Sequence, residues 1–151
     1  MEPVVYSAFR YYRIDPDDIE QVPAEPTPFL GGGLSRCVGI GIDEPPCQLV
    51  LEDFFPGAEY RWTTYIDQLD LVTEGSCEIR YMLAPAYERE ETVVVEAPCI
   101  YLLPKGTRVV WKPLGEGTFR HISIDMPNPK FPVEDAASVK RAKLAAAGEG
   151  R

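Results

Sequence analysis

The sequence has a single histidine, His121, and an acidic residue, Asp70, that shares a strand face with Gln68 in the predicted pattern. An imidazole titrates near neutral pH, and the pKa of a carboxyl group rises when burial removes it from water. Two such groups in one pocket are suited to general acid–base catalysis near pH 7. We therefore predict that Asp70 and His121 are the catalytic residues.

The residues expected around this pair are aromatic or polar and uncharged, which is the usual composition of a small-molecule site. The hydroxyl groups of Tyr60 and Tyr81 have the chemistry to hold or polarise a carbonyl group. The predicted substrate-binding residues are Tyr60, Trp62, Thr64, Gln68, Tyr81, Trp111 and Ser123. Together they favour proton transfer next to a carbonyl, in a lyase, isomerase or cyclase that needs no cofactor.

Each of these residues also has a purely structural interpretation. Asp70 is suited to accept hydrogen bonds from backbone amides in the turn at 67–69, and His121 is suited to a satisfied position in the core. Trp62 and Trp111 have the volume to fill the interior and the flat faces to stack on a ligand. A binding module without catalysis, either a ligand sensor or an accessory protein of a metabolic gene cluster, is therefore the alternative function.

The elements that position these side chains are predicted to be short strands. The chain contains 15 prolines and 12 glycines, and such frequent interruptions favour short strands over long helices. Segments with an alternating or continuous apolar pattern predict strands at 37–42, 48–54, 58–65, 69–73, 77–83, 92–96, 100–103, 107–111 and 118–125. Because no helical segment separates them, we predict an all-β sandwich or barrel.

Alternation within a strand assigns side chains to the interior or to solvent. Charged residues such as Arg80, Arg108 and Arg120 are expected on the outer face. In the last strand, Ile122 and Ile124 favour the opposite assignment. The residues expected to face inward are Tyr60, Trp62, Thr64, Cys77, Ile79, Tyr81, Leu83, Thr107, Val109, Trp111, Phe119, His121, Ser123 and Asp125.

The segment that ends at Gly75 resembles the first motif of the cupin superfamily, G-x5-H-x-H-x3,4-E-x6-G. Counting back from Gly75 places Gln68 at the glutamate position of the motif, and Trp62 and Thr64 at the two histidine positions. The leading glycine is present as Gly57, one residue out of register. The glycine frame of the motif is therefore kept while the metal-ligand positions are replaced.

A second cupin motif, G-x5-P-x-G-x2-H-x3-N, resembles the segment around Pro104-Lys105-Gly106. Its histidine position falls on Val109, its asparagine position on Pro113 and its leading glycine on Pro98. The resemblance covers roughly residues 48–127. It implies a cupin-type jelly-roll β-barrel whose pocket lies inside the barrel.

Within that superfamily the chain looks most like the Q-type cupins of ethanolamine utilisation. The matching residues are Trp62, Thr63, Asp67, Asp70, Val72, Glu74 and Gly75. Gln68 stands where that group tends to have Glu. Trp and Val are not metal ligands, and Thr and Gln are poor ones for a transition metal. The residues at these positions therefore predict that no metal is bound at the usual cupin site. A metal-dependent cupin with atypical ligands, such as Asp70 and His121 or residues of a partner subunit, is the further alternative.

The two ends of the chain differ from the barrel in composition. Residues 1–35 are predicted to form an irregular arm that packs on the barrel or on a partner, residues 36–127 the barrel, and residues 128–151 a helical tail. The arm carries an aromatic cluster of Tyr6, Phe9, Tyr11 and Tyr12. This arm and the run at 93–95 are suited to cover an exposed sheet edge, so we predict a homodimer.

Composition restricts the partners and the compartment. The formal net charge of −9 and a pI of about 4.6 repel nucleic acids and anionic membranes. The first residues lack the basic-then-apolar pattern of a secretion signal, and no apolar run has the length of a membrane span. The four cysteines show no C-x-x-C spacing. We expect a cytoplasmic protein with reduced, mostly buried thiols.

Overall fold

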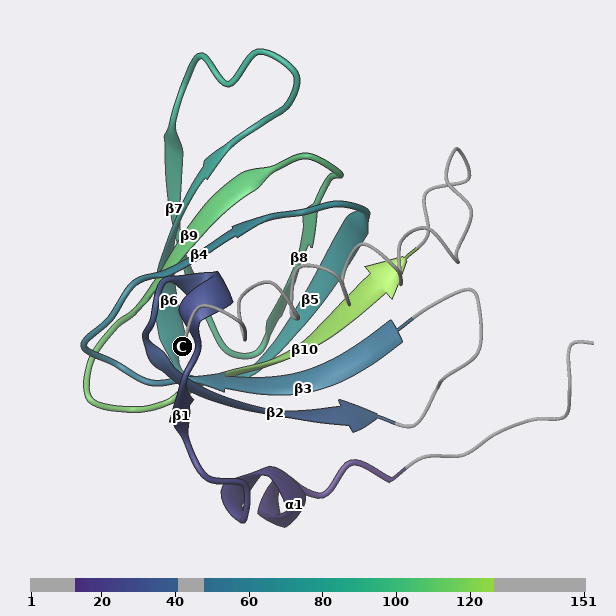
Figure 1. Ribbon diagram of the computed structural model, residues 1–151, viewed down its shortest axis with the longest axis vertical. Coiled ribbons are helices and arrows are strands. Elements are labelled where there is room, and N and C mark those ends of the chain that lie inside the picture. The colour runs from purple at the N-terminus through teal and green to yellow at the C-terminus, as the bar shows by residue number, and fades with distance from the viewer. Residues whose placement is uncertain (1–12, 41–47, 127–151) are drawn as a thin grey trace, which may run out of the picture.

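A computed structural model describes residues 13–40 and 48–126 (Figure 1). The described residues form ten strands, one short α-helix and one 3-10 helix. In chain order they are α1 (Pro16–Glu20), β1 (Glu25–Pro26), η1 (Pro28–Leu30), β2 (Leu34–Ile40), β3 (Gln48–Phe54), β4 (Tyr60–Thr63), β5 (Asp67–Glu74), β6 (Ser76–Met82), β7 (Glu91–Glu96), β8 (Cys99–Leu103), β9 (Arg108–Pro113) and β10 (Phe119–Met126). No helix among the described residues is long and apolar enough to cross a bilayer.

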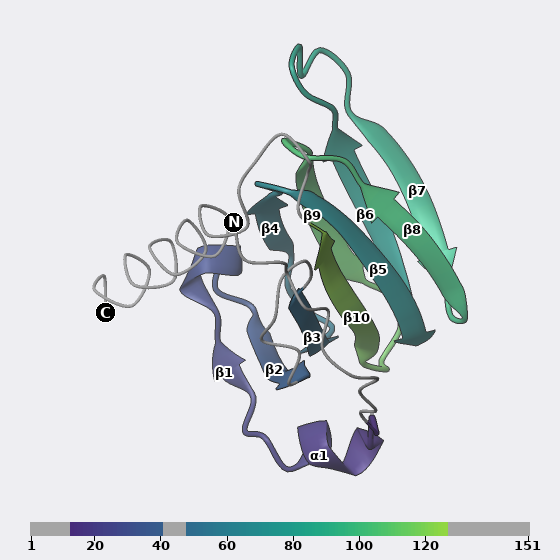
Figure 2. The same ribbon diagram turned by 90° about the vertical axis from the view of Figure 1, so that its right-hand side faces the viewer.

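The strands form two antiparallel sheets that face each other (Figures 1 and 2). One sheet has the order β1-β2-β3-β10-β5-β8, and the other has the order β4-β9-β6-β7. Strands that are distant in the chain, such as β3 and β10, are therefore neighbours. The prediction of an all-β, jelly-roll architecture is confirmed.

The main hydrophobic core lies between the two sheets. Its ring contacts include Phe54 stacked on Tyr60, with ring centroids 4.1 Å apart. The buried members of this cluster are Leu30, Phe54, Tyr60, Val72, Cys77, Ile79, Leu103, Val109, Trp111 and Phe119. Most of them occupy alternate positions of their strands, as the period of two predicts.

A second, smaller cluster lies on the outer face of the larger sheet, where α1 covers β3 and β10. Ile19 of α1 is buried against Leu51 and Ile122. Both interpretations of β10 therefore hold, because one face points into the barrel and the other lies beneath α1. Arg120 points to the outer face as predicted, but it is buried with only 4% exposure instead of solvated. The covering helix is the reason.

Other predictions about the described residues were wrong. Leu83 is 50% exposed, because β6 ends at Met82 and the chain leaves the sheet there. The described part of the predicted irregular arm contains regular elements, and β2 already begins at Leu34. Cys37 is exposed, although Cys77 is buried and Cys99 is half-buried. The aromatic cluster at 6–12 and the predicted helical tail at 128–151 lie outside the described residues.

Two glycines of the sequence motifs occupy turns that side chains disfavour. Gly75 joins β5 to β6 with φ of 80°, and a Cβ added there would lie 2.4 Å from the carbonyl oxygen of Thr118. Gly106 has φ of 84° in the turn before β9. Positive φ is readily available only to glycine, so the motif frame reflects backbone geometry.

Candidate functional site

A cavity of about 250 Å³ lies inside the barrel. Its wall combines aromatic rings with the carboxylates of Glu52 and Asp125. The lining residues are Phe29, Leu30, Cys37, Gly39, Val50, Glu52, Phe54, Trp62, Tyr65, Gln68, Trp111, Ser123 and Asp125. A concave and largely apolar wall with a few convergent polar groups is the usual form of a small-molecule site.

Some of the predicted substrate-binding residues line this cavity and others do not. Trp62, Gln68, Trp111 and Ser123 are part of the wall, whereas Tyr60, Thr64 and Tyr81 are not. The Tyr60 hydroxyl accepts a hydrogen bond from the Phe55 amide at 3.0 Å and also contacts the carbonyl of Leu34.

Thr64 likewise serves the local backbone. Its hydroxyl donates to the carbonyl of Pro104 at 2.7 Å and accepts from the amide of Thr107 at 2.9 Å. These bonds hold the turn before β9 against the end of β4. The observed contacts of Tyr60 and Thr64 are therefore to the backbone of the barrel, and neither hydroxyl reaches the cavity.

Asp70 and His121 come together, but they lie behind the cavity wall. Both are fully buried, and neither lines the cavity. The His121 Nε2 atom lies 3.2 Å from Oε2 of Glu52 and 3.9 Å from Oδ1 of Asp70. In the described structure His121 Nδ1 has no hydrogen-bond partner. The imidazole therefore connects a carboxylate at the wall to a carboxylate in the interior.

The buried carboxylate of Asp70 is held by neutral donors. The Gln68 side-chain amide donates to both Asp70 oxygens at 3.1 and 3.2 Å. Tyr101 accepts a hydrogen bond from Trp111 Nε1 at 2.9 Å, and burial followed by the charge of Asp70 raises the pKa of its hydroxyl. Hydrogen bonds therefore link the wall residue Gln68 to the buried acid and the wall residue Trp111 to Tyr101.

The environment shifts the pKa values of this group in a consistent way. Burial raises the pKa of Asp70 to about 6, although His121 and the Gln68 amide favour its ionised form. For His121, burial lowers the pKa, but the hydrogen bond to Glu52 and the charge of Asp70 outweigh it and raise the pKa above its usual value. The pKa of Asp70 thus lies in the range where acid–base catalysts operate, and the pKa of His121 is shifted upward.

Glu52 and Tyr101 were not identified from the sequence. Glu52 faces inward because it shares its strand face with Val50 and Phe54, while Leu51 on the other face packs beneath α1. The sequence signal for Glu52 is that a large aromatic residue, Phe54, follows two positions later, on the same face of the strand. Tyr101 lies in a continuously apolar strand, in which alternation carries no information.

The positions that correspond to cupin metal ligands do not fit a metal. Thr64 is bonded to backbone groups, the Gln68 amide donates to Asp70, and Val109 is an apolar residue of the core. Trp62 contacts Phe29 edge to face, with ring centroids 6.1 Å apart. In the parts of the chain that the structure describes, no three His, Cys, Asp or Glu side chains converge as ligands.

Comparisons with known proteins identify the fold. No protein-family model and no curated protein sequence matches the chain. Solved structures do match: a cupin-like protein from Thermotoga maritima has 16% identity and a TM-score of 0.56 over 74% of this chain and 83% of that one. The EutQ protein of Clostridium difficile has 15% identity and a TM-score of 0.53, over 71% of this chain and 80% of that one.

A third similar structure is Drosophila melanogaster CENP-C bound to CAL1. It has 15% identity and a TM-score of 0.53, over 69% of this chain and 79% of that one. These matches show that the chain has the cupin jelly-roll fold and that EutQ structures are among its structural neighbours. The fold predicted from the two motifs is confirmed.

Proposed function

We propose that the protein is a metal-independent small-molecule enzyme of the cupin fold, of the lyase, isomerase or cyclase type. Its reaction is a proton transfer next to a carbonyl group of a substrate held in the barrel cavity. The observation that carries this proposal is the contact series from Glu52 through His121 to Asp70, which begins at the cavity wall and ends in the core.

The three residues have different roles in this proposal. Glu52 is the catalytic residue, because its carboxylate lines the cavity and is within reach of a substrate. His121 and Asp70 are positioning residues: the Nε2–H of His121 donates to Glu52 and holds its carboxylate in place, and Asp70 lies 3.9 Å from the same nitrogen and favours the charged imidazole. The sequence placed both residues in direct contact with substrate, whereas the geometry supports a place one layer behind.

The rest of the wall supports binding of a compact, uncharged or cationic carbonyl compound. Trp62 and Trp111 offer ring faces for stacking, and Ser123 offers a hydroxyl. Two carboxylates line the cavity, and no Lys or Arg is among its described lining residues. The local potential therefore disfavours an anionic substrate.

Hydrogen–deuterium exchange at carbon tests this function without knowledge of the net reaction. Small carbonyl compounds that raise the melting temperature are incubated with the protein in D2O, and loss of the α-proton signal is followed by NMR. Glu52→Gln is expected to slow this exchange by about 10²- to 10⁴-fold, because general base catalysis contributes that much. Glu116→Gln, in an exposed loop, is the matched control and is expected to keep full activity.

The pH profile separates the positioning residues from simple structural ones. His121→Gln is expected to shift the pH dependence of exchange, since it removes the group that couples Glu52 to Asp70. Full exchange activity in Glu52→Gln would contradict the proposed role of Glu52.

A binding module without catalysis is the second candidate. The observation that favours it is the complete burial of His121 and Asp70 behind the wall. In that case a carbonyl compound would bind tightly with no exchange over hours, and Glu52→Gln would alter affinity only.

We also propose that the protein is a homodimer. Apolar side chains on the outer face of β5 and β8 are paired in register, Leu71 opposite Ile100, and Leu102 lies beside them. Ile100 is 60% exposed and Leu102 is 53% exposed. Contact with a second copy would remove this apolar surface from water.

Sedimentation equilibrium at micromolar concentration tests the dimer. We expect twice the chain mass of 16.9 kDa. Leu102→Lys is expected to shift the protein toward the monomer, because a charge would replace apolar surface at the contact. A monomer for the unmodified chain would refute the proposal.

A further inference from the structure

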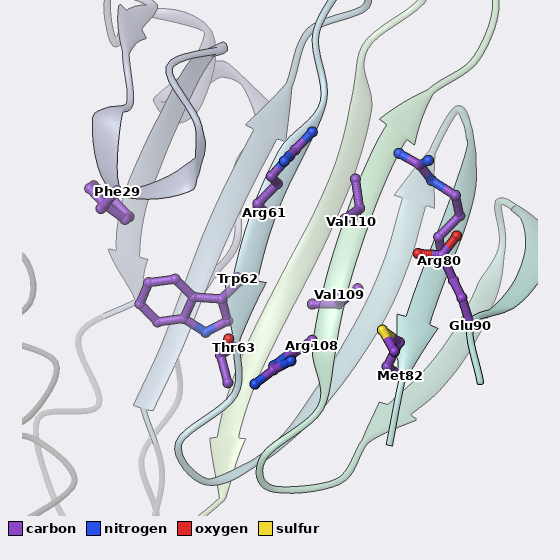
Figure 3. Close-up of a pocket in the computed structure, with 10 residues that line it drawn as sticks. All are labelled: Phe29, Arg61, Trp62, Thr63, Arg80, Met82, Glu90, Arg108, Val109 and Val110. Atoms are coloured by element: carbon purple, nitrogen blue, oxygen red, sulfur yellow. The ribbon is translucent and has the colours of Figure 1, made fainter. Parts of the chain in front are cut away.

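A second hollow lies on the outside of the barrel, on the face of β4, β9 and β6 that is turned away from the core (Figure 3). It is an open groove of about 750 Å³. We call it the outer groove. The residues that line it are Phe29, Arg61, Trp62, Thr63, Arg80, Met82, Glu90, Arg108, Val109 and Val110. Three arginines from three adjacent strands are the distinctive part of this set.

Strand register explains how these arginines come together. Arg61 and Arg80 both pair with Val110 of β9, so they flank it in one row across the sheet. Arg108 lies in the next row of the same face, between Thr63 and Met82. The row of Arg61 is about 7 Å from the row of Arg108, because two residues separate them along the strand.

The three guanidinium groups form two cationic ends of the groove. Figure 3 shows the heads of Arg61 and Arg80 directed toward one end and the head of Arg108 directed toward the other. Val110 and Met82 lie between these ends and make the middle of the groove apolar. The groove thus has two charged ends joined by a hydrophobic surface.

The first end already holds an oxyanion of the protein itself. Glu59 accepts from Arg80 at 2.5 Å and from Arg61 at 3.3 Å. One carboxylate bound to two guanidinium groups leaves an excess positive charge at this end, and Arg61 is 69% exposed. Each guanidinium has five N–H donors, so donors remain for a further anion.

The second end has a cation with an aromatic partner. The Arg108 guanidinium lies 3.8 Å from the centroid of the Tyr87 ring. Among the described residues it forms no ion pair, and Glu90 is the one carboxylate that lines the groove with it. Stacking on Tyr87 orients the guanidinium while its edge donors stay available.

We propose that the outer groove binds a small organic dianion, whose two acidic groups are separated by an apolar spacer. One acidic group occupies the end formed by Arg61 and Arg80, and the other pairs with Arg108. The spacer lies over Val110 and Met82. Planar guanidinium groups bind carboxylate and phosphate oxygens in a bidentate manner, which suits both ends.

This site borders the barrel cavity at Phe29 and Trp62, which line both, but its charged residues are different. The cavity wall carries the carboxylates of Glu52 and Asp125, so its potential has the opposite sign. The whole chain has a net charge of −9, whereas the side chains that line the outer groove carry a net positive charge. A dianion is therefore directed to the outer surface and away from the cavity.

Titration with adipate tests the proposal, and hexanoate is the control ligand with the same number of carbons and one acidic group. Binding is followed through amide shifts in ¹⁵N-labelled full-length protein. We expect adipate to shift the amides of β4, β6 and β9, and hexanoate to bind about tenfold more weakly, since it lacks one charged hydrogen-bonding end. Binding is expected to weaken with added salt.

Two variants each remove one positive charge from β9, one inside the outer groove and one outside it. Arg108→Gln is expected to weaken adipate binding about tenfold. Lys112→Gln, on the same face of β9 but outside the groove, is expected to leave it nearly unchanged. Glu90→Gln is expected to strengthen binding, because it removes a carboxylate from the groove.

Equal losses in Arg108→Gln and Lys112→Gln would overturn the proposal, because they would indicate only a general effect of charge. Equal binding of hexanoate and adipate, or shifts centred on the residues of the barrel cavity, would also overturn it. Retention of the native melting temperature by each variant ensures that these comparisons concern binding.

Discussion

Arg120→Met is expected to lower the free energy of unfolding by about 3–5 kcal/mol. Arg120 binds Asp53 in a bidentate manner, with Nε to Oδ1 at 2.7 Å and Nη2 to Oδ2 at 3.0 Å. Asp53 is fully buried, so removing Arg120 leaves a buried carboxylate with one remaining charged partner, Arg36 at 2.7 Å. The same change also removes the contact between Arg120 and Glu74 at 3.0 Å.

Urea unfolding followed by circular dichroism measures this effect. Arg89→Met is the matched control, because Arg89 also forms an ion pair at 2.7 Å but its side chain is 82% exposed. An exposed pair contributes little, so this variant is expected to lose less than about 1 kcal/mol. In addition, Arg120→Met combined with Asp53→Asn is expected to lose less than the sum of the single changes. Similar losses for Arg120→Met and Arg89→Met would contradict the buried-pair explanation.

Asp70→Asn is expected to gain stability relative to the unmodified protein as pH rises, by about 2–3 kcal/mol between pH 4 and pH 7. Burial raises the pKa of Asp70 from 3.8 to about 6 in the folded state. The folded state therefore binds this proton more tightly than the unfolded state does. Ionisation of Asp70 between pH 4 and 6 thus lowers the free energy of unfolding, and asparagine cannot ionise.

His121 acts in the same direction at higher pH. Its folded-state pKa is raised, so the stability that it contributes is present below its unfolded pKa of 6.5 and is lost as pH rises through the folded value. Denaturant unfolding of the unmodified protein and of Asp70→Asn at a series of pH values gives the difference between their free energies of unfolding as a function of pH. Asp18→Asn, an exposed change on α1, controls for the loss of one carboxylate. A flat difference curve for Asp70→Asn would show that Asp70 does not titrate in this range.

The strand pattern and the motif glycines were predictable from the sequence because they reflect local geometry. Alternation in 107–111 correctly placed Thr107, Val109 and Trp111 inside. Gly75 and Gly106 mark turns whose positive φ excludes most side chains, so the cupin frame persists even where the metal-ligand positions differ. These features depend only on neighbours in the chain.

The composition of the candidate site was decided by tertiary structure. Strand β10 lies between β3 and β5, and this order places His121 directly opposite Glu52 and Ser123 opposite Asp70. The docking of α1 buries both faces of β10, which made the alternation of this strand ambiguous. A period of two shows which residues share a face, but backbone hydrogen bonding is the same for every strand. The sequence alone therefore determined the faces, and only the packed sheets decided which faces meet.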